Sequence, residues 1–298
     1  VMLIPNNVQK TKMFQYAGAS RFAYNWALAR EKENYEKGGR FISDAELRKE
    51  FTKLRHSDEY AWLLNISNNV TKQAIKDACT AYKNFFRGLQ KFPRFKSKHH
   101  SRNSYTTNVV NGNILVESKR IRLPKLKWIA MKKHREPAEG LRLKSVTVSM
   151  EPSGKYFASL LYEGYSCENQ AAESDYSTAK ILGIDYAMQG MAVFSEKIET
   201  EEAGFFRKNE KRLAREQRKL SRCVRGSHNY ELQKKKVARC HEKIRNQRRD
   251  YLHKLSRKIA DNYDAVAVED IDMKAMGQCL HFGKSVQDNG YGMFREML

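Results

Sequence analysis

Several features that mark other classes of protein are missing from this sequence. No apolar run approaches the roughly 18 residues that would predict a membrane-spanning helix, and we find no signal peptide. The five cysteines are widely spaced and include no C-x-x-C pair, which argues against a disulfide framework and a zinc site. We therefore expect a cytoplasmic protein with reduced thiols and no membrane partner.

Acidic residues are scarce relative to basic ones. The 298 residues contain 34 Asp or Glu against 56 Lys or Arg, a formal net charge of +22. Since 41% of the residues are hydrophobic, as is ordinary for a globular protein, this charge does not indicate disorder. A pI near 9.7 predicts a polyanionic partner, most commonly nucleic acid. The length suffices for two or three domains.

Recognisable nucleophile arrangements and histidine clusters with ligand spacing are absent too, and the candidate chemical groups are two carboxylates on strand-like runs. Ile181–Asp185 and Ala265–Val268 are apolar, strand-like runs, and they deliver Asp185 and Glu269. If the two strands are neighbours, both acids emerge at one place, where hard oxygen ligands would suit Mg²⁺. Two alternatives stay open: solvated turn residues, or a phosphate-binding turn of an actin-like ATPase that starts at Gly183.

Between the two acids, the segment from about 204 to 260 has a helical pattern that is interrupted at Arg225–Asn229. Apolar residues spaced seven apart predict an antiparallel helical hairpin with a narrow apolar seam: Leu213 and Leu220, then Val237, Ile244 and Tyr251. The stretch Arg207–Lys258 contains 20 Lys or Arg and five Asp or Glu, an excess of +15. Because arginine suits bidentate phosphate contacts, we expect nucleic-acid binding by Arg215, Arg218, Arg222, Arg245, Arg248 and Arg249.

The first half of the chain combines helices with short strands. Val1–Pro5 predicts a strand, and the pattern from about Val8 to Arg87 is helical. Within it, Ser43 and Glu46 have the spacing of a capping box, and Val70–Leu89 is amphipathic with Lys72 and Lys76 on a basic side.

A β pattern then extends from Tyr105 to Tyr162. Its clearest part is a predicted hairpin between Ser145–Met150 and Tyr156–Leu161. The polar stretch Gly164–Ala179 has no periodicity and predicts a linker.

An ordered series of motifs resembles the TnpB family, the transposon-encoded RNA-guided nucleases related to compact type V CRISPR effectors. The matching segments are R-F-A-Y-N at 21–25, A-Y-K-N-F-F at 81–86, F-P-R-F-K at 92–96, R-L-P-K-L at 122–126, G-I-D at 183–185, R-R-D-Y-L-H-K-L at 248–255, V-E-D at 268–270 and S-V-Q-D-N-G-Y-G-M-F at 285–294. Single motifs are weak, but their order covers nearly the whole chain.

The resemblance implies an α+β multidomain fold. It places a wedge-like β-barrel at 1–8 and 99–165, with a helical recognition domain inserted at 9–98. After a linker at 166–179, a RuvC-like domain of ribonuclease-H fold would occupy 180–298, with the helical hairpin as an insertion.

Function is implied in the same way. Asp185 and Glu269 would be catalytic acids that bind Mg²⁺, with two ions in the complete site. The partners would be a guide RNA and double-stranded target DNA carrying a short adjacent motif, and a monomer is favoured. Ser43, Lys72 and Asn111 fall where the family contacts that motif, although they could equally be ordinary surface residues. Lys72 and Lys76 would help to hold the nucleic acid.

The sequence also departs from the family pattern. The third catalytic acid of the family follows a zinc ribbon, and neither is found here; Asp288 matches a different family position. Because Val1 enters a strand and Leu298 ends a helix-like segment, we expect further residues at both ends, with Zn²⁺ only in a C-terminal segment. The leading hypothesis is an RNA-guided DNA endonuclease. The rivals are a nuclease-inactive RNA-guided DNA-binding regulator and a structural RNA-binding protein.

Overall fold

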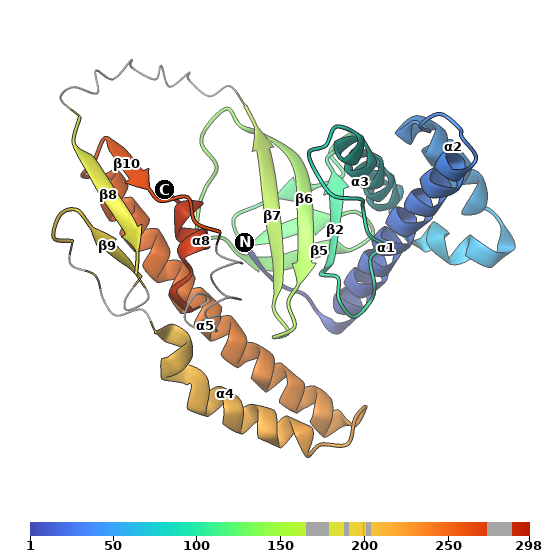
Figure 1. The fold of residues 1–298 in the computed structure, drawn as a ribbon. Helices are drawn as coiled ribbons and strands as arrows, with labels where there is room; N and C mark the ends of the chain where they lie inside the picture. Colours follow the sequence, from blue (N-terminus) through green and yellow to red (C-terminus); the bar gives the residue numbers. More distant parts are fainter. Residues whose placement is uncertain (165–178, 188–190, 199, 201–203, 273–287) are drawn as a thin grey trace. The chain divides into compact units, whose positions relative to one another are not determined.

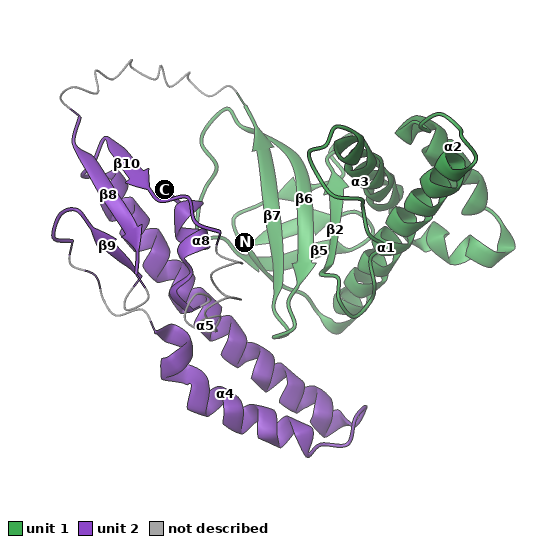
Figure 2. Ribbon diagram, viewed as in Figure 1, with its two compact units in different colours: residues 1–167 green, residues 168–298 purple. Residues whose placement is uncertain are grey.

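The computed structural model describes residues 1–164, 179–187, 191–198, 200, 204–272 and 288–298 (Figure 1). The chain divides into two compact units, Val1–Cys167 and Glu168–Leu298 (Figure 2). All of the predicted linker except residue 179 lies outside the described residues, as do two of the cysteines, Cys167 and Cys279. The other three cysteines are free thiols. None of the helices in the described ranges is long and apolar enough to cross a membrane.

A seven-stranded antiparallel sheet forms the base of the first unit, in the order β2-β6-β7-β1-β5-β4-β3. Its strands are β1 (Met2–Ile4), β2 (Asn103–Asn108), β3 (Leu115–Val116), β4 (Arg120–Leu123), β5 (Lys127–Lys132), β6 (Arg142–Met150) and β7 (Tyr156–Glu163). The predicted hairpin is confirmed, because Ser145 pairs with Leu161 and Met150 with Tyr156. Since β2 and β3 each have one neighbour among the described strands, the sheet is a curled half-barrel, and the complete wedge-like β-barrel stays a prediction.

Helices connect β1 to the rest of this sheet: α1 (Asn7–Glu36), α2 (Asp44–Leu54), the 3-10 helix η1 (Asp58–Asn65) and α3 (Asn68–Phe86). The capping box at Ser43 is confirmed at the start of α2. Helix α3 ends three residues before the predicted Leu89, because Gly88 takes a φ of +70°. The N–H of Leu89 then donates to the Asn84 carbonyl at 2.9 Å, which closes the helix end.

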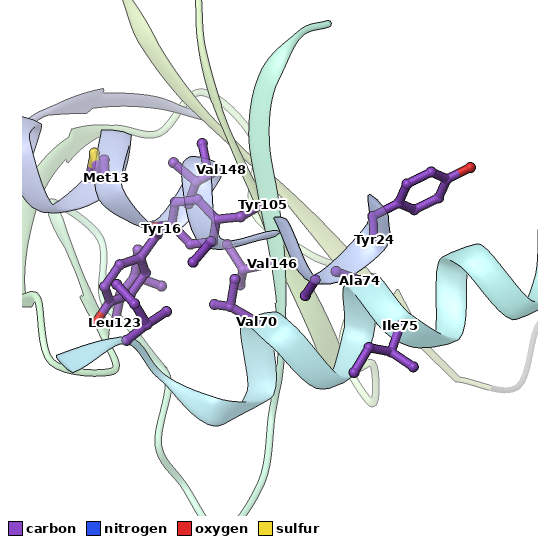
Figure 3. Close-up of a cluster of buried hydrophobic side chains, with 14 of the residues drawn as sticks. Met13, Tyr16, Tyr24, Val70, Ala74, Ile75, Tyr105, Leu123, Val146 and Val148 are labelled. Atoms are coloured by element: carbon purple, nitrogen blue, oxygen red, sulfur yellow. The ribbon is translucent and has the colours of Figure 1, made fainter. Parts of the chain in front are cut away.

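The core of the first unit lies between the helices and the sheet. Tyr16 of α1 meets Tyr105 of β2 edge to face, with ring centroids 5.3 Å apart. Val70 of α3 and Val146 and Val148 of β6 belong to the same buried cluster (Figure 3). Burial of these apolar side chains is the main force that fixes the helices on the sheet.

The second unit has a three-stranded sheet in the order β10-β8-β9 and three described helices. Its elements are β8 (Ile181–Tyr186), β9 (Ala192–Phe194), α4 (Phe205–Ser221), α5 (His228–Ala260), β10 (Ala265–Val268) and α8 (Tyr291–Arg295). Strand β10 is parallel to β8, and β9 is antiparallel to it. Although the residues of β10 are apolar, it is an edge strand among the described residues, and Val268 is 39% exposed.

Helices α4 and α5 form the predicted antiparallel hairpin. Its apolar seam is shorter than expected, because only Leu213, Cys240 and Ile244 are buried there. Tyr251 packs instead in the cluster around the sheet. Next to the seam the contact is polar: Gln233 is buried and donates from Nε2 to Oε2 of Glu216 at 2.7 Å.

Candidate metal centre and nucleic-acid interface

The parallel register of β8 and β10 determines where the two acids lie. Ile184 is the register partner of Val268, the last residue of β10. The next residue on each strand is therefore a carboxylic acid, Asp185 on one side and Glu269 on the other. The two side chains are close enough to share a hydrogen bond. The structure thus brings together two acids that are 84 positions apart in the sequence.

The contact between these acids has an electrostatic consequence. The hydrogen bond with Asp185, partial desolvation and the like charge together raise the pKa of Glu269. Two exposed carboxylates held this close repel each other when both are ionised, and a hard divalent cation would relieve that repulsion. The pair therefore fits a Mg²⁺ site. Groups of three or more His, Cys, Asp or Glu side chains that could hold a metal ion are absent from the described ranges.

Tyr291 lies near this pair, and the sequence analysis did not single it out. It is 2% exposed, and its ring meets that of Tyr186, the neighbour of Asp185, with centroids 4.8 Å apart. Burial, followed by the negative charges of Asp185 and Glu269, raises the pKa of Tyr291. Its hydroxyl has no hydrogen-bond partner among the described residues. The family-like segment at 285–294 was the available signal, but it did not indicate that the tyrosine lies by the acids.

Asp288 belongs to a different part of the second unit and holds the base of the helical hairpin. Its carboxylate is 4% exposed and accepts the backbone N–H groups of Phe206 at 2.8 Å and Arg207 at 3.3 Å. It therefore caps the N-terminus of α4, whose first amides lack partners within the helix. Arg248 of α5 completes the arrangement by donating from Nη2 to the carboxylate at 3.2 Å and from Nε to the Asp288 carbonyl at 2.9 Å.

Two neighbours of Asp288 connect this base to the strand that carries Asp185. Asn289 donates from Nδ2 to the carbonyl of Ala187, just after β8, at 3.4 Å. Gly290 has a φ of +69°, and an added Cβ would lie 2.9 Å from Cδ of Arg248. Only glycine fits that backbone and that close approach without strain.

The arginines predicted to bind nucleic acid differ in their surroundings. Arg215, Arg218, Arg222, Arg245 and Arg249 are exposed on the hairpin. Arg248 is the exception: its side chain is 16% exposed and is bound to Asp288. We give Arg248 a structural role at the hairpin base and do not propose it as a phosphate contact.

The hairpin also has a groove of about 260 Å³ that the sequence analysis did not find. The groove is lined by Asn209, Arg212, Glu216, Lys219, Lys236, Arg239, Cys240 and Lys243. Spacings of three and four residues on both helices were the available signal, but which stripes face each other depends on how α4 and α5 pack.

The predicted contacts outside the hairpin all belong to the first unit. The hydroxyl of Ser43 donates to Glu46 at 2.7 Å and accepts the Glu46 N–H at 3.2 Å, so it serves the capping box. Lys72 and Lys76 are exposed one turn apart on α3. Asn111 is exposed in a turn, with a φ of +48°. Their roles toward DNA remain predictions.

Comparisons with known proteins give this site a context. A family described as "Probable transposase" matches residues 164–279, the segment that contains both acids and the hairpin. A "Helix-turn-helix domain" of the same family matches residues 1–40, which here form β1 and the single long helix α1.

Two curated relatives align along almost the whole chain. A protein of Escherichia coli (strain K12), provisionally named RNA-guided DNA endonuclease InsQ, is 35% identical over 276 residues, which cover 93% of this chain and 66% of that protein. A Streptomyces pristinaespiralis protein, also provisionally named an RNA-guided DNA endonuclease, is 29% identical over 299 residues, which cover 99% of this chain and 71% of that protein. The chain thus spans about two thirds of the length of these relatives.

Solved structures show a weaker likeness. A CRISPR-Cas12f ternary complex aligns with 96% of this chain and 69% of that chain, at 13% identity and a TM-score of 0.31. A Cas12f1–sgRNA–target DNA complex aligns with 95% and 77%, at 14% identity and a TM-score of 0.24. At such TM-scores the likeness carries no argument for the fold. The matches to the family and to the curated relatives do show common ancestry. On that evidence the chain belongs to the TnpB family, whose transposase-related members include these provisionally named RNA-guided DNA endonucleases.

Proposed function

We propose that this chain is the main part of an RNA-guided DNA endonuclease in which Asp185 and Glu269 bind Mg²⁺ at a RuvC-like site. The observation that carries the proposal is the contact between the two carboxylates, which the β8–β10 register produces. Carboxylates on neighbouring strands are rigid supports for hard metal ions. When bound, such ions activate water and stabilise charge on the leaving oxygen of a phosphodiester.

The residues of the chain itself would position the metal and the nucleic acid. Asp185 and Glu269 would hold the ion in their ionised forms, so metal binding would release the proton that the raised pKa of Glu269 favours. Guide RNA and the guide–target duplex would lie against the basic hairpin, and Lys72 and Lys76 would add contacts. Ser43, Lys72 and Asn111 are proposed to meet the motif beside the target. The third acid and the zinc ribbon implied by the family resemblance stay predictions.

Guided plasmid cleavage in Mg²⁺ by the full-length protein, bound to its guide RNA, tests the assignment. We expect Asp185→Ala and Glu269→Gln each to lower cleavage by about a thousandfold or more, and EDTA to stop it. Asp261→Asn is the control, because it removes an exposed carboxylate of the same unit that lies at the C-cap of α5, outside the acidic pair. Cleavage that persists in Asp185→Ala would exclude that residue from the site.

The alternative is a nuclease-inactive protein that binds DNA under RNA guidance. It is favoured by the finding that the described ranges bring two carboxylates together and not three. A filter-binding assay on the same target at saturating Mg²⁺ separates the two. Guided binding without any strand cleavage would decide for the alternative.

A further inference from the structure

The groove between α4 and α5 contains a concentration of positive charge. Five of its lining residues are basic: Arg212 and Lys219 from α4, and Lys236, Arg239 and Lys243 from α5. Glu216 is its only acid, so the lining carries a formal charge of +4. All five basic residues are exposed.

Helix geometry explains why these residues share one surface. Arg212, Glu216 and Lys219 are spaced four and three residues apart, which places them in one stripe along α4. Lys236, Cys240 and Lys243 form the corresponding stripe on α5. The two antiparallel helices pack so that both stripes line one groove. At one end of the interface, Nδ2 of Asn209 donates to Oε1 of Gln247 at 3.3 Å.

The arginines predicted from composition lie on other stripes. Arg215, Arg218 and Arg222 follow one another along α4 at spacings of three and four residues, and none of them lines the groove. The same is true of Arg245 and Arg249, which are four residues apart on α5. Composition therefore points to the hairpin as a whole, whereas packing picks out a different set of cations within it.

Glu216 is the acid that lines the groove, and it lies close to basic residues. Its side chain is 12% exposed and accepts the hydrogen bond from Gln233, and Lys219 lies 3.8 Å away. The hydrogen bond from Gln233 and the charges of Lys219, Arg215 and Lys236 lower the pKa of Glu216. The acid thus stays ionised and opposes any anion that enters the groove.

We propose that this groove binds consecutive phosphates of a polynucleotide backbone. The distance along α4 from Arg212 to Lys219 is about 10 Å at 1.5 Å per residue, which equals the axial rise of about three nucleotide steps at roughly 3.4 Å each. Contacts of this kind read no base sequence and depend strongly on salt. The inference rests on the proposed function for the class of ligand, but it concerns binding and not cleavage.

Salt-dependent binding tests the proposal with the full 298-residue chain. The probe is a fluorescein-labelled, single-stranded 20-nucleotide RNA of mixed sequence, followed by fluorescence anisotropy across a series of KCl concentrations. The variant Arg212→Gln/Lys236→Gln/Lys243→Gln removes three groove cations. We expect the slope of log K against log [KCl] to become shallower by about 2, since each lost phosphate contact on a single strand contributes about 0.7.

A matched control removes the same charge from elsewhere on the hairpin. Lys211→Gln/Arg225→Gln/Lys234→Gln also replaces two lysines and one arginine, all exposed and none lining the groove. We expect its salt slope to stay within about 0.5 of the parent chain. Equal losses in the two triple variants would show that only total charge matters, and an unchanged slope in the groove variant would show that the groove holds no phosphate. Either result overturns the proposal.

A variant that is expected to bind more tightly distinguishes loss of groove contacts from misfolding. Glu216→Gln removes the acid of the groove and keeps a side chain of the same size, so we expect binding to tighten by about two- to threefold at low salt. A damaged fold would weaken binding instead. Weaker or unchanged binding by Glu216→Gln in a protein with a normal unfolding transition would contradict the proposal.

A DNA strand of the same sequence, in a second arm, identifies which nucleic acid the groove prefers. A larger slope change with RNA assigns the groove to the guide, and a larger change with DNA assigns it to the target. Loss of cleavage in Asp185→Ala with normal groove binding would leave both proposals standing. Normal groove binding in a protein that never cleaves would overturn the nuclease proposal alone.

Discussion

Glu31 is a carboxylic acid in the core of the first unit. Its side chain is on α1 and is 2% exposed. One carboxylate oxygen accepts the Ile42 N–H at 3.4 Å, and the other has no hydrogen-bond partner among the described residues. Burial raises the pKa of Glu31 to about 7. An acid of this kind is tolerated in its protonated form and costs stability once it ionises.

We therefore expect Glu31→Gln to stabilise the protein at alkaline pH. Because the folded pKa is higher than the unfolded one, stability is highest when Glu31 is protonated in both states and falls between about pH 4.5 and 7. Above pH 7 the substitution should raise the free energy of unfolding by about 1–2 kcal/mol after allowance for solvent screening. Near pH 4 it should change that free energy little. Urea unfolding at pH 4.5 and pH 8 measures both, with the exposed Glu33→Gln as the control. A stabilisation that is equal at the two pH values would contradict the role of ionisation.

At the same scale, the pattern of residues predicted some side chains and not others. Asp185 and Glu269 could be paired from sequence because each follows a short apolar run, and runs of that type form neighbouring strands. Tyr291 and Arg248 could not be assigned, because their surroundings depend on how α8 and α5 pack against the sheet. An arginine in a basic helix has the same local sequence whether it faces solvent or Asp288.

Among the elements, the start of α4 depends on a residue far along the chain. The N-cap position is Gly204, which offers no side chain to bind the free amides. Asp288 supplies the missing acceptors from 81 residues beyond Arg207. The same carboxylate neutralises Arg248, so one residue stabilises both helices of the hairpin.

Asp288→Asn should therefore destabilise the second unit by about 3 kcal/mol, because it leaves a largely buried guanidinium without its counter-charge and weakens a cap. Hydrogen exchange at the Phe206 and Arg207 amides, together with urea unfolding, measures this effect. Asp261→Asn breaks an ion pair whose side chains are 79% and 50% exposed, and we expect it to cost less than about 0.5 kcal/mol. Adding Arg248→Met to Asp288→Asn should recover part of the loss. If hydrogen exchange at these two amides is unchanged in Asp288→Asn, Asp288 does not cap α4.

The ends of helices could be predicted where the residues that determine them are close in the sequence. The capping box at Ser43 and the break before α5 were predicted from residues within one turn of each boundary. The seam of the hairpin was predicted less well, because a heptad spacing marks every apolar position and does not show which pairs meet. Gln233 and Glu216 lie in that interface as a hydrogen-bonded pair, which no apolar pattern signals.

For the whole molecule, two separate cores are the dominant feature. Leu28 is 1% exposed in the core of the first unit, and Leu252 is fully buried in that of the second. The matched family segment at 164–279 lies in the second unit apart from its first four residues. The order of domains was expected from the resemblance, whereas composition alone predicted only the number of domains that the length allows.

We expect each core to control its own unfolding transition. Leu28→Ala and Leu252→Ala should each cost about 2–5 kcal/mol, because each empties a fully packed site. Differential scanning calorimetry should show that each substitution lowers one transition and leaves the other in place. If both substitutions lower a single common transition by similar amounts, the two units unfold together.

The parallel pairing of β8 with β10 also bears on the order in which the second unit folds. Asp185 and Glu269 are 84 residues apart, and the whole α4–α5 hairpin is made between them. Local helical contacts form quickly, whereas a strand pair that closes so long a loop forms slowly. When the chain folds, the basic hairpin can therefore form before β10 pairs with β8 and brings Glu269 to Asp185. Under the proposed function, a folding chain could then bind its nucleic-acid partner through the hairpin before the acidic pair that would hold the metal is assembled.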